Sequence, residues 1–415
     1  MKTMLAPMVA VLLLQVAFPQ TAADPLAFID GQEPPTSPAA DGNHLLEYWE
    51  AHDRTPQEYL ASKFRDKKWV FVGEYHRIRH DVELIASLVP LLHETTDVRH
   101  LALEFLCRDR TEEANGLVTA ASYDRGRVFD FFRGQFPAWG YEEYLDIFRQ
   151  TWESNKRLAE ERGPFRLVGL HPCIDWETIH YGTDPEAVRV EKRKQEQYDE
   201  IMAEALEESL LRPGHKALIF TGIAHATGKF VEYRIGTEDQ LVRMGNLVHR
   251  EPYKKGMFFV CLHAPFYDGA AGKEIYPFDG TLDELMLRFG RDIGFDVVGT
   301  PFEGLAHAER SPYAITSYSF GELYDGYVIF RTPVKDYEGV TCIEDWITSE
   351  GELRDFARNV SNREASLAFS KVSLEEFRRD RCAPRPDHGS EFRRRFRKLP
   401  DLPVGPVGAG ATGPD

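Results

Sequence analysis

The chain has 415 residues, 42% of them hydrophobic, with 50 basic and 67 acidic residues and a formal net charge of −17. This length and apolar content are sufficient for a sizeable core, in one large α/β domain or two smaller ones. We favour a single domain over residues 43–382. The acidic balance argues against nucleic acid as a partner, because phosphate binding requires clustered Lys and Arg.

The two ends of the chain have the composition of targeting and connecting segments. Residues 1–23 carry Lys2, an apolar run and a small-residue exit, which is typical of a cleaved secretory signal peptide. Residues 24–42 are predicted to be a Pro- and Gly-rich linker, and residues 383–415 a basic, Pro/Gly-rich, disordered tail. No later apolar run reaches the length of about 18 residues that a membrane span needs. We therefore expect a secreted or periplasmic protein without a transmembrane segment.

Five cysteines are too few for a disulfide scaffold in a chain of this size, and their odd number leaves at least one outside any intramolecular pair. Cys107, Cys173 and Cys261 each stand at a β-rich apolar run, and the spacing contains no CxxC motif. We interpret these three as unpaired core or rim thiols rather than catalytic nucleophiles.

Two helices are predicted first, over residues 44–52 and 56–64, the second with a capping box of Thr55 and Glu58. Beyond them, short β-rich runs alternate with long helical patterns, which is typical of a parallel sheet covered on both faces. We predict a three-layer α/β fold with a mostly parallel central sheet flanked by helices. The predicted strands are 67–73, 100–106, 165–171, 216–222, 257–263 and 325–330, and the predicted helices between them are 81–94, 141–163, 186–211 and 281–290.

Titratable side chains close five consecutive predicted strands. Ligands of open parallel sheets bind beyond the carboxyl ends of the strands, so we expect the site there. The second strand contains Glu104 near its end, and a carboxylate in such an apolar strand needs a partner. The residues at the ends of all five strands are Glu74 with His76, Glu104, His171, His225 and His263.

Glu and His side chains suit two kinds of site. A carboxylate beside an imidazole orients it and raises its basicity, which makes the His a general base for water. Alternatively, two His and two carboxylates ligate a divalent cation that acidifies bound water. Glu74, His76, Glu104 and His225 are the candidates in both cases, as catalytic groups or as metal ligands.

The motifs resemble the superfamily that contains erythromycin esterases, ChaN-like haem-binding proteins and the Tiki/TraB proteins. The resemblance covers residues 44–335 and rests on Gly73-Glu74-Tyr75-His76, Glu104 and Gly222-Ile223-Ala224-His225 in this order. It implies a parallel central sheet with a pocket at the strand ends, and it assigns site roles to Glu74, His76, Glu104 and His225. It leaves the chemistry open, because the superfamily includes metal-independent hydrolases with a His base, metal-dependent proteases and haem-binding proteins.

Our leading hypothesis is an exported hydrolase of ester or amide bonds, with a divalent metal as an optional cofactor. The alternative is a ChaN-like haem or iron uptake protein without turnover, with Tyr75, His80 and His171 as candidate cofactor-binding residues, and a third possibility is a catalytically inactive interaction domain. The aromatic segment 128–144 follows the second strand and is either a packed helix start or a cover for a small-molecule ligand or substrate of apolar character. The sequence does not indicate an oligomeric state.

Overall fold

The predicted strands form close to where the sequence pattern places them. The computed structural model describes residues 42–135, 139–233, 240–264, 266–268, 273–306, 318–331, 338–361 and 363–381. The predicted signal peptide and tail, and nearly all of the predicted linker, lie outside these residues. All six predicted strands are present within one or two residues of the expected bounds. The strands that were not predicted are β10 (Ile293–Asp296) and the short β5 (Glu232–Tyr233), β6 (Gln240–Leu241), β8 (Phe266–Asp268) and β9 (Lys273–Ile275).

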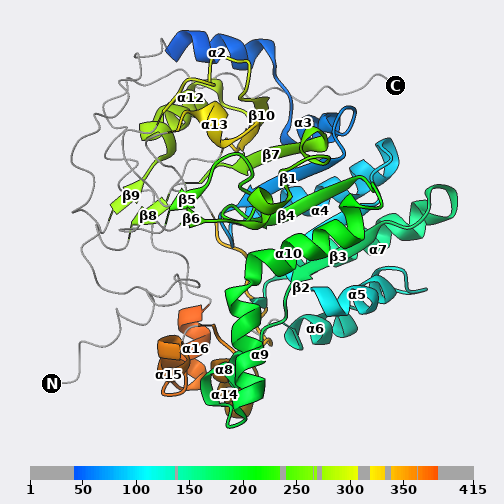
Figure 1. Cartoon of the computed structure of the whole chain (residues 1–415), viewed down its shortest axis with the longest axis vertical. Coiled ribbons are helices and arrows are strands. Elements are labelled where there is room, and N and C mark those ends of the chain that lie inside the picture. The colour runs from blue at the N-terminus through cyan, green and yellow to red at the C-terminus, as the bar shows by residue number, and fades with distance from the viewer. Residues whose placement is uncertain are drawn as a thin grey trace, which may run out of the picture. The chain divides into compact units, whose positions relative to one another are not determined.

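The chain divides into two compact units. Within the described residues, the larger unit comprises 60–261 and 338–381, and the smaller comprises 42–59 and 262–331. The strands of the larger unit are β1 (Trp69–Glu74), β2 (His100–Cys107), β3 (Arg166–His171), β4 (Ala217–Gly222) and β7 (Met257–Leu262). They are parallel and lie in the order β7-β1-β4-β2-β3. The predicted α/β class with a mostly parallel sheet is thus confirmed (Figure 1).

Helices of the larger unit cover both faces of this sheet. Phe71, Ala102 and Ile219 belong to one buried cluster with Met202 and Leu206 of α10. Since successive side chains of a strand alternate between faces, the fully buried neighbours of these strand residues point to the opposite face. The long helices α4 and α7, which pack against each other, belong to the same unit. The helices of this unit are α3 (Pro56–Lys63, which begins in the smaller unit), α4 (Arg79–Thr95), α5 (Thr111–Val118), α6 (Arg125–Arg133), α7 (Glu142–Arg162), α8 (Trp176–Tyr181), α9 (Pro185–Glu196), α10 (Tyr198–Leu206), α11 (Met244–Val248), α14 (Glu350–Arg358), α15 (Arg363–Phe369) and α16 (Leu374–Arg381).

The smaller unit contains β10 and β11 (Gly326–Ile329), which form an antiparallel pair. Its helices are α2 (Gly42–Ala51), α12 (Thr281–Phe289) and α13 (Phe320–Leu323). The ring of Trp49 on α2 is fully buried and contacts the rings of Phe289, Phe295 and Phe302. This aromatic cluster makes a core of its own for the unit.

Two local features match the sequence and one differs. The capping box before α3 is present, with the Glu58 amide donating to Thr55 Oγ1 at 3.3 Å and the Thr55 amide donating to Glu58 Oε2 at 3.1 Å. Helix α7 ends at Gly163, whose positive φ of 76° suits glycine. The predicted long helix over 186–211 is instead interrupted at Gln197, between α9 and α10.

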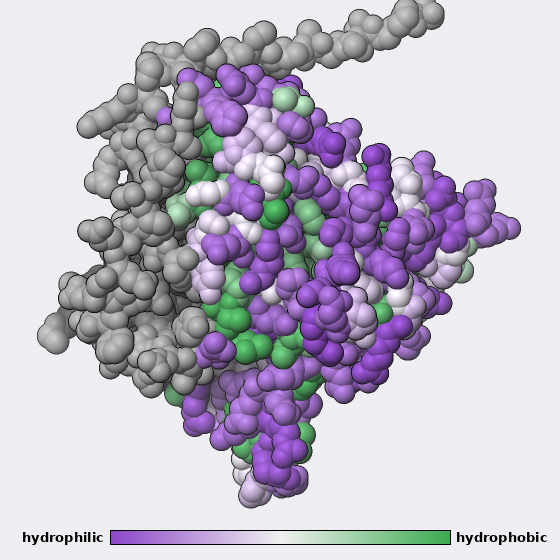
Figure 2. All heavy atoms as spheres, turned by 45° about the horizontal axis from the view of Figure 1, so that its top comes forward, coloured by the Kyte–Doolittle hydropathy of each residue, from purple (hydrophilic) through white to green (hydrophobic). Residues whose placement is uncertain are grey.

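Polar side chains cover most of the described surface on the face shown in Figure 2. None of the helices among the described residues is long and apolar enough to cross a membrane.

Candidate active site

The four predicted site residues lie close together at the carboxyl ends of three neighbouring strands, β1, β4 and β2. Glu74 ends β1 and His76 follows two residues later, Glu104 lies near the end of β2, and His225 follows β4. His76 Nε2 is 4.0 Å from Glu104 Oε2, and His225 Nε2 is 3.5 Å from Glu104 Oε1. Glu104 therefore lies between the two imidazoles.

An irregularity in β2 accompanies Glu104. The pairing of β2 with β3 shifts register between Leu103 and Cys107, as in a β-bulge. Bulges re-aim side chains and are common beside active sites. Glu104 Oε2 accepts a hydrogen bond from the Gly222 amide at 2.5 Å, and Oε1 accepts one from the Tyr198 hydroxyl at 3.3 Å. The bulge thus directs the Glu104 carboxylate toward the Gly222 amide and the Tyr198 hydroxyl, whose hydrogen bonds replace those that water would make.

Gly222 is required by the close approach of these groups. A Cβ atom added at Gly222 would lie 2.6 Å from His76 Nε2 and 3.3 Å from Glu104 Oε2. Real Cβ atoms do not come as near as the first distance, so any larger residue would displace the imidazole. Glycine at position 222 is therefore explained by the closeness of the His76 ring, and the sequence motif alone does not reveal this contact.

His76 is held at its Nδ1 nitrogen by a buried carboxylate. Its Nδ1 donates to Glu74 Oε1 at 2.9 Å, since an ionised carboxylate can only accept. The Tyr144 hydroxyl from α7 lies 3.0 and 3.1 Å from the two oxygens of Glu74 and donates to that carboxylate. Although burial lowers the pKa of His76, the hydrogen bond and charge of Glu74, with the charge of Glu104, raise it overall. The side chain of His76 remains 38% exposed, so its Nε2 is the nitrogen that can meet a substrate or water.

His225 is held in the same way by a residue that the sequence analysis did not single out. Its Nδ1 donates to Asp199 Oδ1 at 2.7 Å, and that oxygen also accepts from the Met244 amide at 2.7 Å. Arg243 Nη1 lies 3.6 Å from the other Asp199 oxygen. Burial lowers the pKa of His225, but the charges of Glu104 and Asp199 outweigh it and raise the pKa.

The carboxylates in turn are stabilised in their ionised form. Burial would raise the pKa of Glu104, but His225, His76 and the Gly222 amide lower it. Burial is likewise outweighed at Asp199, whose pKa His225 lowers most. Burial and the Glu104 charge raise the pKa of Tyr198 well above its ordinary value, so its hydroxyl stays a donor. The site is thus two carboxylate-anchored imidazoles facing a shared third carboxylate.

Sequence reasoning missed Tyr198, Asp199 and Arg243. It included Tyr144 in the aromatic segment 128–144 but did not predict the contact with Glu74. A signal exists for Asp199, because it shares the buried face of α10 with Met202, Ala203 and Leu206, at helical spacing. A buried carboxylate on an otherwise apolar helix face needs a partner. The prediction of one continuous charged helix over 186–211 obscures this face.

The other predicted residues differ in their surroundings. Tyr75 is half-buried beside Glu74 and His76. His80 lies in the first turn of α4, with Nε2 3.3 Å from Asp81 Oδ1. His171 ends β3, where its ring contacts that of Tyr198 with the centroids 5.2 Å apart. His263 is fully buried and bonds within the smaller unit, to the Tyr327 hydroxyl at 2.9 Å and to Asp283 Oδ1 at 3.0 Å.

The aromatic segment 128–144 divides between core and site. Phe131 and Phe132 of α6 are buried against Phe148 of α7, which is a packing role. The ring of Trp139 meets that of His76 edge to face at 5.2 Å, and the Arg77 guanidinium lies 5.2 Å from the Trp139 ring centroid. Residues 136–138 lie outside the described residues. An aromatic group therefore borders His76, while most of the segment does not line the site.

The interpretation of Cys107 and Cys173 as unpaired thiols is wrong. These two residues form a disulfide, with their Cα atoms 5.3 Å apart. The physical reason is the sheet order: β2 and β3 are neighbours, so the last residue of β2 comes next to the loop that follows β3. Strand order is not visible in sequence spacing. Cys261 is buried at the end of β7, as expected for a core residue.

Comparisons with known proteins find distant structural matches and no family. No known family's sequence profile matches the chain. No curated protein matches it either. Among solved structures, a protein from Bacillus cereus is 12% identical with a TM-score of 0.46, over 70% of this chain and 97% of that one. A mutant of erythromycin esterase EreC in its open conformation is 12% identical with a TM-score of 0.44, over 66% and 92%.

ChaN of Campylobacter jejuni, in a structure with cofacially bound haem, is 10% identical with a TM-score of 0.30, over 65% of this chain and 90% of that one. The matches thus include an erythromycin esterase and a ChaN protein, two of the kinds of protein that the sequence motifs resemble. At such identities and TM-scores the likeness carries no conclusion on activity or on site residues.

Proposed function

We propose that the chain is a hydrolase of ester or amide bonds in which His76 is the general base. One observation carries this proposal: the Glu74–His76 pair, in which Nδ1 is fixed by a carboxylate and Nε2 is left at a partly exposed position beside Gly222. This is the arrangement in which a neutral imidazole accepts a proton from water.

The proposed reaction uses both imidazoles in different protonation states. Neutral His76 accepts a proton at Nε2 from water as the water oxygen bonds to the carbonyl carbon. His225, as an imidazolium between Glu104 and Asp199, stabilises the negative charge that develops on the substrate. It then donates its Nε2 proton to the leaving oxygen or nitrogen as the bond between the carbonyl carbon and the leaving group breaks. The proton taken up by His76 then restores His225 through solvent. The pKa values of both imidazoles are raised: at His225 this favours the imidazolium, and at His76 it makes the ring a stronger proton acceptor, so that turnover requires a pH at which His76 is neutral.

The donor atoms of Glu74, His76, Glu104 and His225 do not all lie within 4.8 Å of one another. The described part of the chain contains one cluster of three or more ligand residues whose donor atoms all lie within 4.8 Å of one another, and it is not this one. A cation shared by Glu74, His76, Glu104 and His225 stays a prediction, and the proposed reaction uses none. Haem at Tyr75, His80 or His171 also stays a prediction, because no particular contact of these residues favours it.

Export of the protein is part of the proposal. Disulfides persist mainly in secreted and periplasmic proteins, and the Cys107–Cys173 disulfide supports such a compartment. The predicted signal peptide agrees with it.

The test is to measure hydrolysis of aryl esters, a lactone and an aryl amide by the wild-type protein and by His76→Ala. We expect turnover of at least one substrate and a loss of about 100-fold or more in the variant, the scale usual for a general base. His180→Ala is a matched control, since His180 is also half-buried and bonded, at 3.0 Å to the Val360 carbonyl, but lies on α8. Equal rates for wild type and His76→Ala, or no turnover of any substrate with or without divalent metal, would contradict the proposal.

A further inference from the structure

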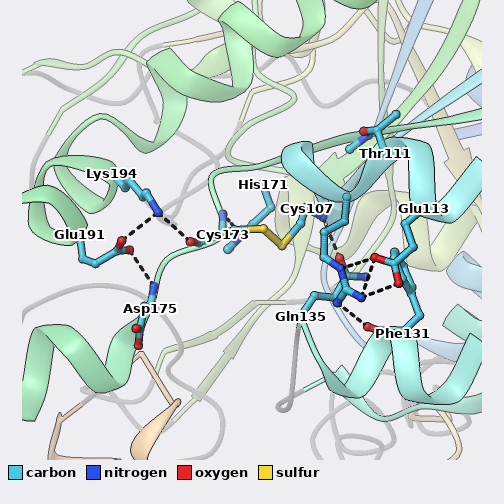
Figure 3. The surroundings of a disulfide bond; sticks show 12 residues. Cys107, Thr111, Glu113, Phe131, Gln135, His171, Cys173, Asp175, Glu191 and Lys194 are labelled. Carbon is cyan, nitrogen blue, oxygen red and sulfur yellow. Dashed lines mark hydrogen bonds and ion pairs between the residues drawn. A yellow bond between two sulfur atoms is a disulfide. The ribbon is translucent and has the colours of Figure 1, made fainter. Parts of the chain in front are cut away.

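A second cluster of chemically active side chains lies at the ends of β2 and β3. Cys107 is the last residue of β2, His171 is the last residue of β3 and pairs with Cys107 in the sheet, and Cys173 follows two residues later. Figure 3 shows the three residues around the disulfide. One donor atom from each lies within 4.8 Å of the other two. The described residues contain no other group of three that meets this spacing.

The donor set is one that soft divalent metals prefer. Two thiolates and an imidazole are ligands of zinc, and three protein ligands with an open fourth position are common for this ion. The Cys173 amide donates to His171 Nδ1 at 2.9 Å, so this nitrogen is unprotonated and its lone pair can bind a cation once that hydrogen bond is released.

We propose that reduction of the Cys107–Cys173 disulfide creates a binding site for zinc or another thiophilic divalent cation, held by both thiolates and by His171. The proposal does not rest on the hydrolase activity. A thiol or phosphine reductant supplies two electrons to the disulfide, which takes up two protons to give two thiols. Binding of the cation then releases both protons, and the imidazole contributes its lone pair without a proton change, apart from the loss of the hydrogen bond from the Cys173 amide.

The backbone already has the spacing that such a site needs. With Zn–S bonds of about 2.3 Å and tetrahedral angles, the two sulfur atoms would lie about 3.8 Å apart. The Cα atoms of the two cysteines are 5.3 Å apart, so rotation about the side-chain bonds is sufficient. The loop that carries Cys173 is also anchored independently of the disulfide, because Lys194 donates to the Cys173 carbonyl at 3.2 Å and to Glu191 at 2.9 Å.

A fourth ligand can reach the site from solvent. Both cysteines line a cavity of about 560 Å³, together with Gln135 and Asp175. A water molecule, or a carboxylate from a bound molecule, can therefore complete the coordination. The same cavity gives a reductant access to the disulfide.

The experiment uses the full chain and Co²⁺ as a spectroscopic probe, since thiolate ligands give Co²⁺ a charge-transfer absorption that carboxylates and imidazoles do not. The wild-type protein is compared before and after reduction by a phosphine without oxygen. We expect one equivalent of Co²⁺ with thiolate absorption in the reduced protein and none in the oxidised protein, with displacement by Zn²⁺. The signal should disappear in Cys173→Ser and weaken at least about 10-fold in affinity in His171→Ala. Cys342→Ser is the matched control, because Cys342 is also disulfide-bonded and is opened by the same reductant.

A thiolate signal that persists in Cys173→Ser, or that is absent from the reduced wild type, would overturn the proposal. A second measurement avoids variants that fail to fold: alkylation of the reduced wild type with iodoacetamide, read peptide by peptide by mass spectrometry. Zn²⁺ should protect Cys107 and Cys173 and leave Cys342 reactive. Equal alkylation of Cys107 and Cys173 with and without Zn²⁺ would contradict the site. A failure of either test leaves the esterase assay unaffected, because His76 and His225 are not involved.

Discussion

Replacing Glu104 with glutamine separates a role in the site from a role in the fold. Glutamine keeps the shape of the side chain and a carbonyl oxygen that can accept from the Gly222 amide, now at 2.5 Å, and it removes the charge between the two imidazoles. Exchanging a hydrogen bond to a charged group for a neutral one costs about 1 kcal/mol of unfolding free energy. For a unit of this size, that corresponds to a melting temperature lower by about 2–4 °C.

The effect on activity should be much larger. Glu104 contributes the largest favourable charge to the raised pKa of His225 and also raises that of His76. Without it, less His225 is protonated at neutral pH, and the proposed acid is lost. We expect kcat/KM for the best chromogenic ester to fall by about 100-fold. Glu204→Gln is the matched control, since Glu204 belongs to the same unit, on α10, but pairs with Arg108 at 2.8 Å and is more than half exposed.

The assay combines ester turnover with thermal melts of both variants, with and without Zn²⁺. The reasoning would be refuted by a metal-independent loss of about 3–5 kcal/mol in Glu104→Gln with unchanged activity per folded molecule. That result would make Glu104 a structural carboxylate. A melting temperature that Zn²⁺ raises in the wild type and not in the variant would instead favour the shared cation.

Three further predictions follow from the same contacts. The pKa values of His76 and His225 are raised, so the stability that these residues contribute is complete below their ordinary pKa of 6.5 and is lost as pH rises through the raised values. The pKa values of Glu104 and Asp199 are lowered, so the stability that these residues contribute is complete above their ordinary values of 4.5 and 3.8 and is lost as pH falls through the lowered values. The decline in melting temperature above pH 6.5 should therefore be smaller in His225→Gln than in the wild type; an identical decline would contradict the coupling. Gly222→Ala should displace the His76 ring and lower kcat/KM by about 100-fold while the circular dichroism spectrum is retained, and full activity would show that the contact is unimportant. Asp199→Asn should lower the pKa of His225 and move the alkaline limb of the pH–rate profile to lower pH, and an unshifted limb would remove His225 from the reaction.

Local sequence pattern is enough to predict the layered α/β class and the location of most of the site. Strand runs such as 69–74 and 217–222 alternate with helices, and because this pattern is local, a single chain suffices to recognise it. Parallel strands present their carboxyl ends at one edge, so Glu74, Glu104 and His225 can be grouped from their positions at the ends of the predicted strands. The short strand β10 escapes prediction, because IGFD is only four residues long and lacks a distinctive period.

The groups that complete the site depend on packing between distant elements. Asp199 reaches His225 because α10 packs beside β3 and α11, and Tyr144 reaches Glu74 from a helix 70 residues away in sequence. The Cys107–Cys173 disulfide likewise depends on β3 lying beside β2. Periodicity records which face of an element is buried, but it does not record which element covers that face. Pairing between side chains from distant elements therefore appears only when the sheet and its helices are assembled.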